Sequence, residues 1–365
     1  MSESDVYTAL AERHGFGTSE RYRRILEFVM SPRQARLAAL LPMEPEELAA
    51  KEGVPVETVN ADLKELFKKG VVFPKNFYTL ETFRFARHVT QLHDATESLW
   101  GIEGIYTDEQ KLQLWSLWWD FVRNEWEPQR MPQLAASPRP PLRIIPAYKA
   151  IKDIPGVLPY EDMSAIFEGA GLISVVSCSC RKRKEAFGDP CLRSHDMNCI
   201  QFNRSAEYTD GRGHGHLLSK EEALRMIEET EDDGLVHQWP NAALMSTNTL
   251  CNCCNCCCMN LLPMTEYQVP WTSYYAKSRF EAGNDVAACT GCQDCIDRCQ
   301  FDALSMQKVA GQKKLKASVD AEKCMGCGVC VLVCEPESLT MRLVRPPEHI
   351  PQLNREPAGT HSHGA

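Results

Sequence analysis

The chain has 365 residues, which is enough for two or three domains, each with its own core. Its apolar fraction of 44% and charged fraction of 24% are ordinary for a globular protein and exclude wholesale disorder. The net charge of −9 disfavours general nucleic-acid binding. No apolar run approaches the roughly 18–20 residues that span a bilayer, and the first residues lack the pattern of a signal peptide. We therefore expect a cytoplasmic protein without a membrane span.

Residues 1–78 predict a mainly helical, winged-helix-like domain. The apolar spacing gives helices over about 45–52 and 56–69; Gly70 ends the second, and an extended segment follows it. A helix that reads DNA must offer cations and amides to phosphates and base edges, whereas this second helix mixes acidic and basic side chains. We therefore expect a docking or structural role here, with DNA contact as the less favoured alternative.

Residues 79–140 are expected to form a Trp-rich helical region and a linker, with prolines concentrated over 131–146. Trp115, Trp118, Trp119 and Trp126 fall mostly on one helical stripe. Such a stripe is typical of a core, or of an interface through which the chain joins an oligomer or a complex.

A cysteine-rich α/β domain is expected over 141–262. Its pattern gives a helix at about 160–171, a buried strand that leads into Cys178, and a helix that opens with a capping box at Ser219 and Glu222. A dicluster ferredoxin domain is expected over 263–345 and a flexible tail over 346–365. The predicted fold class is therefore α+β.

The distribution of the 18 cysteines points to metal binding. None precedes Cys178 and none follows Cys334, and they fall into four tight groups. In a reducing cytosol a disulfide framework is not expected, and cysteines that serve only packing would be scattered. Metal ligation is therefore the default interpretation.

Two copies of the spacing C-x2-C-x2-C-x3-C carry the most specific signal. The first three cysteines of each copy surround three corners of an iron–sulfur cube, and the fourth ligates the other cube. One 4Fe–4S cluster is thus assigned to Cys289, Cys292, Cys295 and Cys334. The other is assigned to Cys324, Cys327, Cys330 and Cys299. Two zinc sites are the rival interpretation.

On these motifs, residues 283–342 resemble the bacterial two-cluster ferredoxins. The resemblance implies two 4Fe–4S clusters that carry electrons. Proline usually follows the fourth cysteine in that family, whereas Gln300 stands there in this chain. Asp294, Asp297 and Asp302 near the first motif would form either an acidic docking face for a redox partner or an ordinary solvated surface.

Ten further cysteines are expected to bind metal: Cys178, Cys180, Cys191, Cys199, Cys251, Cys253, Cys254, Cys256, Cys257 and Cys258. If the stretch CNCCNCCC is extended, Cys257 points to the side of Cys251 and Cys253, and Cys258 to the side of Cys254 and Cys256. Ten thiols suffice for one or two additional iron–sulfur clusters, with zinc as the alternative for a subset. Structural thiols or a thiol–disulfide exchange site are further alternatives.

Residues 145–262 also resemble a poorly characterised cysteine-rich domain that is found beside ferredoxin modules in proteins of anaerobes. The pattern that carries this resemblance is C-x-C-R, two spaced cysteines, GLVH and then CNCCxCCC. It implies an iron–sulfur role without a known reaction.

Cations and histidines accompany these thiols: Arg181, Lys182, Arg183, Lys184, Arg193, His195, His214, His216 and His237. The cations would stabilise anionic clusters, bind an anionic substrate, or form a solvated face. The histidines would be ligands or acids, although most histidines are neither. No nucleotide-binding fingerprint occurs, so a bound nucleotide has no support.

We therefore expect an iron–sulfur electron-transfer protein, or a subunit of a redox complex, that exchanges electrons with a flavoprotein or a larger reductase. One alternative is an iron–sulfur reductase with a catalytic cluster in the middle domain and Arg181, His195, His214 or His216 beside it. A second is a redox-sensing regulator that binds DNA. Whether the chain is itself an oxidoreductase stays open, and no catalytic residue is assigned.

Overall fold

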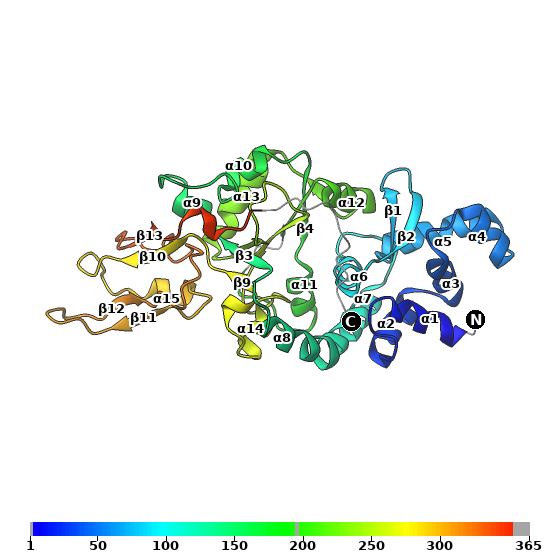
Figure 1. The fold of residues 1–365 in the computed structure, drawn as a ribbon, viewed down its shortest axis with the longest axis horizontal. Helices are drawn as coiled ribbons and strands as arrows, with labels where there is room; N and C mark the ends of the chain where they lie inside the picture. Colours follow the sequence, from blue (N-terminus) through cyan, green and yellow to red (C-terminus); the bar gives the residue numbers. More distant parts are fainter. Residues whose placement is uncertain (1–2, 194–196, 353–365) are drawn as a thin grey trace.

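The computed structural model describes residues 3–193 and 197–352. The fold is α+β, as predicted from the sequence. The molecule is elongated: the N-terminal helices lie at one end, a large sheet lies in the middle, and two small sheets lie at the other end (Figure 1).

The N-terminal region consists of helices followed by a hairpin. The helices are α1 (Glu3–Glu12), α2 (Glu20–Val29), α3 (Pro32–Leu40), α4 (Pro45–Glu52) and α5 (Val56–Lys69), and the hairpin is β1 (Val72–Asn76) with β2 (Glu81–Phe85). The two helices predicted over 45–52 and 56–69 are confirmed. Each ends at a glycine because Gly53 and Gly70 adopt φ values of +66° and +81°, which disfavour any side chain.

The Trp-rich helices pack on this same core. They are α6 (Val89–Glu97), α7 (Asp108–Phe121), a π-helical turn (Val122–Trp126) and α8 (Glu127–Ala135). Trp118 is fully buried, with its ring 6.0 Å from that of Tyr22, and its indole N–H donates to Thr96 Oγ1 at 2.9 Å. Trp115 is also buried, while Trp119 and Trp126 are half-buried. The tryptophan stripe is therefore largely core.

A seven-stranded sheet forms the middle of the molecule, in the order β6-β4-β5-β8-β7-β3-β9. Its strands are β3 (Leu142–Ile145), β4 (Ile173–Ser177), β5 (Met197–Phe202), β6 (His216–Leu217), β7 (Val236–Pro240), β8 (Thr249–Cys253) and β9 (Tyr275–Ala276). Only β3 and β9 run parallel; all the other neighbours are antiparallel. The sheet thus continues beyond residue 262 to include β9.

Helices of the middle region are α9 (Tyr148–Ile151), α10 (Met163–Glu168), α11 (Ser179–Ala186), α12 (Arg204–Arg212), α13 (Lys220–Asp232) and α14 (Leu262–Glu266). The capping box predicted at Ser219 and Glu222 is confirmed at the start of α13. Buried side chains of α10 and α13 pack with those of β4, β5 and β8 in one core. Strand β4 ends at Ser177, so Cys178 caps the N-terminus of α11 directly after it.

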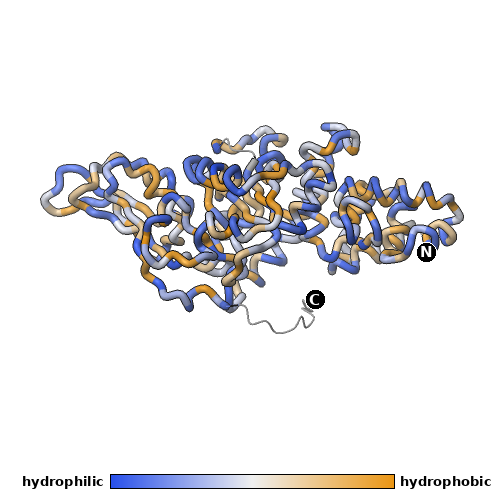
Figure 2. The backbone as a smooth tube through the Cα atoms, turned by 90° about the horizontal axis from the view of Figure 1, so that it is seen from above, coloured by the Kyte–Doolittle hydropathy of each residue, from blue (hydrophilic) through white to orange (hydrophobic). Residues whose placement is uncertain are grey.

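The C-terminal region contains two antiparallel pairs, β10 (Phe280–Asn284) with β13 (Leu339–Leu343) and β11 (Leu304–Gln307) with β12 (Lys316–Val319). The short helix α15 (Asp294–Arg298) and single 3-10 turns at Trp271–Ser273 and Pro347–His349 complete it. Hydrophobic segments are spread along the whole length of the molecule (Figure 2). Within 3–193 and 197–352, no helix combines the length and apolarity that a membrane crossing requires.

Candidate metal centres

Two small cavities of similar size lie in the C-terminal region, and each is lined by four cysteines. Cys289, Cys292, Cys295 and Cys334 line the first, which we call the outer cavity. Cys299, Cys324, Cys327 and Cys330 line the second, the inner cavity. The structure thus brings together the same two sets of four that the spacing predicts, and the thiol donors fit two clusters of one kind.

A glycine and the short helix α15 shape the loops that carry the cavity cysteines. A Cβ at Gly326 would lie 2.1 Å from the carbonyl oxygen of Phe280, and φ at this residue is +74°, so the loop between two inner-cavity cysteines requires glycine. Helix α15 carries Cys295 and ends at Arg298, and Cys299 caps it with an extended backbone, so the two cysteines reach different cavities. The backbone N–H of Ala303 donates to Cys299 Sγ at 3.3 Å, as expected for a cluster-binding thiolate.

The outer cavity lies nearer to solvent than the inner one. Cys292 is exposed, whereas Cys327 and Cys330 are buried. The carboxylates of Asp294 and Asp297 on α15 are exposed as well. An external electron donor or acceptor therefore has closer access to the outer cavity.

Four thiols of the middle region converge on one point. The Sγ atoms of Cys191, Cys254, Cys256 and Cys257 all lie within 4.8 Å of one another, with contacts of 3.3–3.6 Å. An ion with metal–sulfur bonds of about 2.3 Å in a tetrahedron holds its thiolates about 3.8 Å apart. This group, the four-thiol centre, therefore has the size of a mononuclear metal site.

A turn in the cysteine-rich strip builds this centre. Strand β8 ends at Cys253, and the chain then turns so that the N–H of Cys258 donates to the carbonyl oxygen of Cys254 at 3.2 Å. The turn brings Cys257 to the side of Cys254 and Cys256, and returns Cys258 to the side of Cys253. The alternation expected for a fully extended strip is therefore wrong for Cys257 and Cys258, because the extended segment stops five residues earlier than its last cysteine.

The remaining six middle-region thiols lie at the other side of this turn. Cys199 and Cys251 are directly opposite each other on β5 and β8, and Cys253 lies two residues along on the same face. Cys178 and Cys180 belong to the start of α11, next to β5. The structure thus divides the ten thiols between two places.

The basic run that follows Cys180 is not a solvated face. Arg181, Lys182 and Arg183 are buried. Arg181 Nη2 lies 3.9 Å from Cys254 Sγ, so a cation supports the four-thiol centre. The N–H of Arg193 also donates to Cys191 Sγ at 3.4 Å. Lys184, by contrast, is half-buried and forms an ion pair with Asp189 at 3.0 Å.

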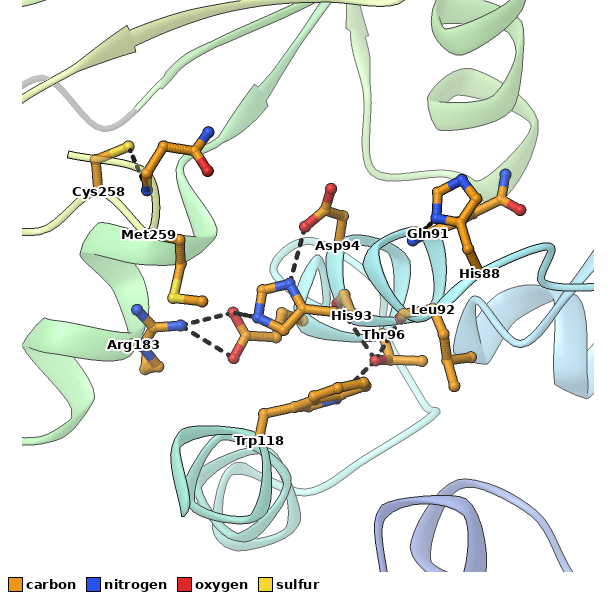
Figure 3. A network of polar contacts seen from close by, with 12 residues as sticks. His88, Gln91, Leu92, His93, Asp94, Thr96, Trp118, Arg183, Cys258 and Met259 are labelled. Carbon is orange, nitrogen blue, oxygen red and sulfur yellow. Dashed lines mark hydrogen bonds and ion pairs between the residues drawn. The ribbon is translucent and has the colours of Figure 1, made fainter. Parts of the chain in front are cut away.

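Arg183 takes part in a network of polar contacts with residues of the N-terminal core (Figure 3). It donates to Glu97 Oε2 at 2.9 Å, and His93 Nε2 lies 3.4 Å from the same carboxylate. His93 Nδ1 in turn lies 2.8 Å from Asp94. Burial lowers the pKa of His93, but the charge of Glu97 and the contact with Asp94 outweigh it, so the pKa is raised. Glu97 and His93 could not be singled out from the sequence, since nothing local marks them.

None of the described candidate histidines joins a thiol group. His237 is buried with Nδ1 2.6 Å from Asn252 Oδ1 and Nε2 3.0 Å from Glu231, so both ring nitrogens are already occupied. His214 is buried beside Tyr208, and His216 is exposed on the edge strand β6. His195 lies outside the described residues.

Comparison with protein families identifies residues 288–337 as a match to the model of the 4Fe–4S dicluster domain. No curated protein and no solved structure matches the chain. The C-terminal region is therefore an iron–sulfur, ferredoxin-like module, and the family match together with the thiol groups indicates an iron–sulfur electron-transfer function.

Proposed function

We propose that the chain carries electrons between an external redox protein and a cysteine-ligated metal centre of its middle domain. In this proposal the outer and inner cavities each hold a 4Fe–4S cluster, and electrons pass from one to the other on their way across the molecule. The clusters supply one-electron chemistry, while the protein positions them and excludes water.

The contact made by Gln300 carries this proposal. Gln300 directly follows the inner-cavity residue Cys299 and is buried. Its Oε1 accepts from the N–H of Asn255 at 2.7 Å, and its Nε2 lies 3.4 Å from the carbonyl oxygen of Cys253. A proline at this position, as in the ferredoxins that the module resembles, could make neither contact. One residue thus links an inner-cavity thiol to the cysteine strip of the middle domain.

Apolar packing connects the same two places. Cys299 and Cys327 of the inner cavity share one core cluster with Cys253 and Cys258, and Phe301 lies in that cluster too. Electron transfer through protein falls steeply with distance, and a close-packed interior keeps both centres at a fixed separation. This junction is therefore a suitable place for electrons to leave the module.

At the opposite side, the exposed Cys292 and the acidic side chains of Asp294 and Asp297 support a docking site for the external partner. A flavoprotein or a larger reductase with a basic face would complement this charge. The alternative of a DNA-binding regulator has less support, because Lys69 is paired with Glu65 and Lys68 donates to the carbonyl oxygen of Arg212.

The test is an anaerobic reductive titration of the full chain, followed by electron paramagnetic resonance and Mössbauer spectroscopy. The proposal predicts that a metal centre outside the dicluster module also changes oxidation state in the course of the titration. If every middle-domain metal stays in one oxidation state throughout the titration, the proposed electron transfer between the module and that domain is wrong.

A further inference from the structure

Six thiols of the middle domain form a closed ring beside the four-thiol centre. In order around the ring they are Cys178, Cys180, Cys258, Cys253, Cys251 and Cys199. Each thiol interacts with the one before it and the one after it, and the last interacts with the first. We call this group the six-thiol ring.

Rigid elements hold the ring in place. Cys199 and Cys251 are fixed by the register of β5 and β8, and Cys178 by the junction between β4 and α11. Cys258 reaches the ring through the turn that ends the cysteine strip. The ring therefore depends on three strands, one helix and a turn, and not on a mobile loop.

The spacing of the ring differs from that of the four-thiol centre. Among the residues that the structure describes, only the four-thiol centre brings three or more ligand atoms within 4.8 Å of one another. No three sulfurs of the ring meet this limit, although each has a neighbour on both sides. A single tetrahedral ion needs its thiolates about 3.8 Å apart, so the ring is too open for one ion. A polynuclear cluster, whose thiolates are bound to different metal atoms, requires this wider spacing.

We propose that the six-thiol ring binds a polynuclear iron–sulfur cluster and that the four-thiol centre binds a single metal ion. The inference deepens the proposed function, since it names the centre that exchanges electrons with the inner cluster of the ferredoxin-like module.

The surroundings of the two groups support this division. Cys253 and Cys258 of the ring pack in the same core cluster as the inner-cavity residue Cys327. Cys254 and Cys257 of the four-thiol centre pack in a separate small cluster with Leu235. The ring thus packs directly against the module through one apolar core, which suits a centre that exchanges electrons with it. The four-thiol centre, by contrast, has the closed four-thiolate form of a structural metal site.

Hydrogen-bond donors to a cysteine sulfur are present at the six-thiol ring as well. Gln238 Nε2 lies 3.5 Å from Cys258 Sγ, and the N–H of Asn260 lies 3.4 Å from the same atom. Hydrogen bonds to ligand sulfurs are one of the means by which proteins set the potential of iron–sulfur clusters. Tyr275 OH completes the arrangement by donating to Gln238 Oε1 at 2.7 Å, which fixes the amide with its N–H₂ toward the sulfur.

The test is to count iron, acid-labile sulfide and zinc per chain in the full-length protein purified without oxygen, together with Mössbauer spectra. The wild-type chain is expected to contain iron and sulfide in excess of about eight of each, the amount that two 4Fe–4S clusters provide. The variant Cys199→Ala should lose this excess of iron and sulfide together. The matched variant Cys191→Ala should lose one metal ion and no sulfide.

A wild-type chain with only about eight irons and eight sulfides would overturn the proposal, and this result does not depend on any variant folding. The proposal would also be wrong if Cys199→Ala kept its full iron and sulfide content while retaining the dicluster spectrum. The two proposals can be tested separately. A ring cluster that is present but never reduced would contradict the proposed electron transfer, while the assignment of the ring as a cluster-binding site would still hold.

Discussion

Arg183 and Glu97 form an ion pair in which both side chains are almost fully buried, with exposed fractions of 3% and 1%. Glu97 ends helix α6 of the N-terminal core, and Arg183 lies on α11 next to the thiol groups. The guanidinium also lies over the ring of Trp119, 4.6 Å from its centre. The pair therefore fastens the N-terminal helices to the cysteine-rich region.

Breaking this pair should destabilise the protein strongly. In Glu97→Ala the buried guanidinium of Arg183 loses its counter-ion, which typically costs about 3–5 kcal/mol. Urea unfolding of the anaerobic protein measures the change. The matched control is Glu27→Ala, which removes the partner of Arg23 from a more exposed, solvent-screened pair and should cost far less. Equal losses of stability in both variants would contradict the assignment of Arg183 and Glu97 as the fastening pair.

Removing the side chain of Gln300 should weaken the junction between the module and the middle domain. In Gln300→Ala the half-buried N–H of Asn255 loses its acceptor, which costs about 1 kcal/mol, and reduction of the middle-domain centre should slow several-fold. Rapid-freeze electron paramagnetic resonance after mixing with dithionite measures this rate. The control is Gln307→Ala, an exposed glutamine of the same module. A wild-type rate in Gln300→Ala would exclude this residue from the route of the electrons.

Inner-cavity and outer-cavity ligands should differ in their effects. Cys327→Ser should lose the inner cluster, about four irons, and so cut the middle domain off from the outer cluster. Cys292→Ser should lose the outer cluster and leave the inner one able to reduce the middle domain. Iron counts and reductive titrations of the two variants test this. If the middle domain is still reduced at the normal rate in Cys327→Ser, the inner cluster is not on the route.

Acid should destabilise the N-terminal core through His14. Burial lowers the pKa of His14 from 6.5 to about 4, against an opposing hydrogen bond with the carbonyl oxygen of Ala86. Because the unfolded chain binds this proton below pH 6.5 and the folded chain only below about pH 4, stability falls as the pH drops through that window. Between pH 7 and 5 the loss due to His14 is about 2 kcal/mol.

The variant His14→Gln should lack this part of the pH dependence. Urea unfolding followed by the fluorescence of Trp118, which lies in the same core, would measure it at several pH values. The variant should start less stable at pH 7 and lose less stability on acidification. Identical slopes for variant and wild type would show that another group is responsible.

Local sequence patterns were sufficient to predict some features of the fold and of the metal centres. The two sets of four module cysteines could be predicted because short loops with fixed spacing determine which thiols meet. The helices over 45–52 and 56–69 could be predicted because glycine ends each of them. The helix ends are determined within a few residues, and the fourth cysteine of each set comes from the other copy of the motif, as the two-cluster pattern specifies.

The turn in the cysteine strip could not be predicted, because it depends on a partner far along the chain. Asn255 at the turn is held by Gln300, 45 residues later, and its own sequence context gives no sign of this. For the same reason the burial of Arg183 was not foreseen: its partner Glu97 lies 86 residues earlier. A run of basic residues predicts an exposed surface unless the buried carboxylate that pairs with it is known.

The most direct test of this account is Mössbauer spectroscopy of the full-length chain, labelled with iron-57 and reduced stepwise without oxygen. The account predicts iron in excess of the two 4Fe–4S clusters, in a centre that is lost in Cys199→Ala and that changes oxidation state during the stepwise reduction. A spectrum that contains the two module clusters alone, with zinc as the remaining metal, would contradict it. The middle domain would then be a scaffold, and electron transfer would be confined to residues 288–337.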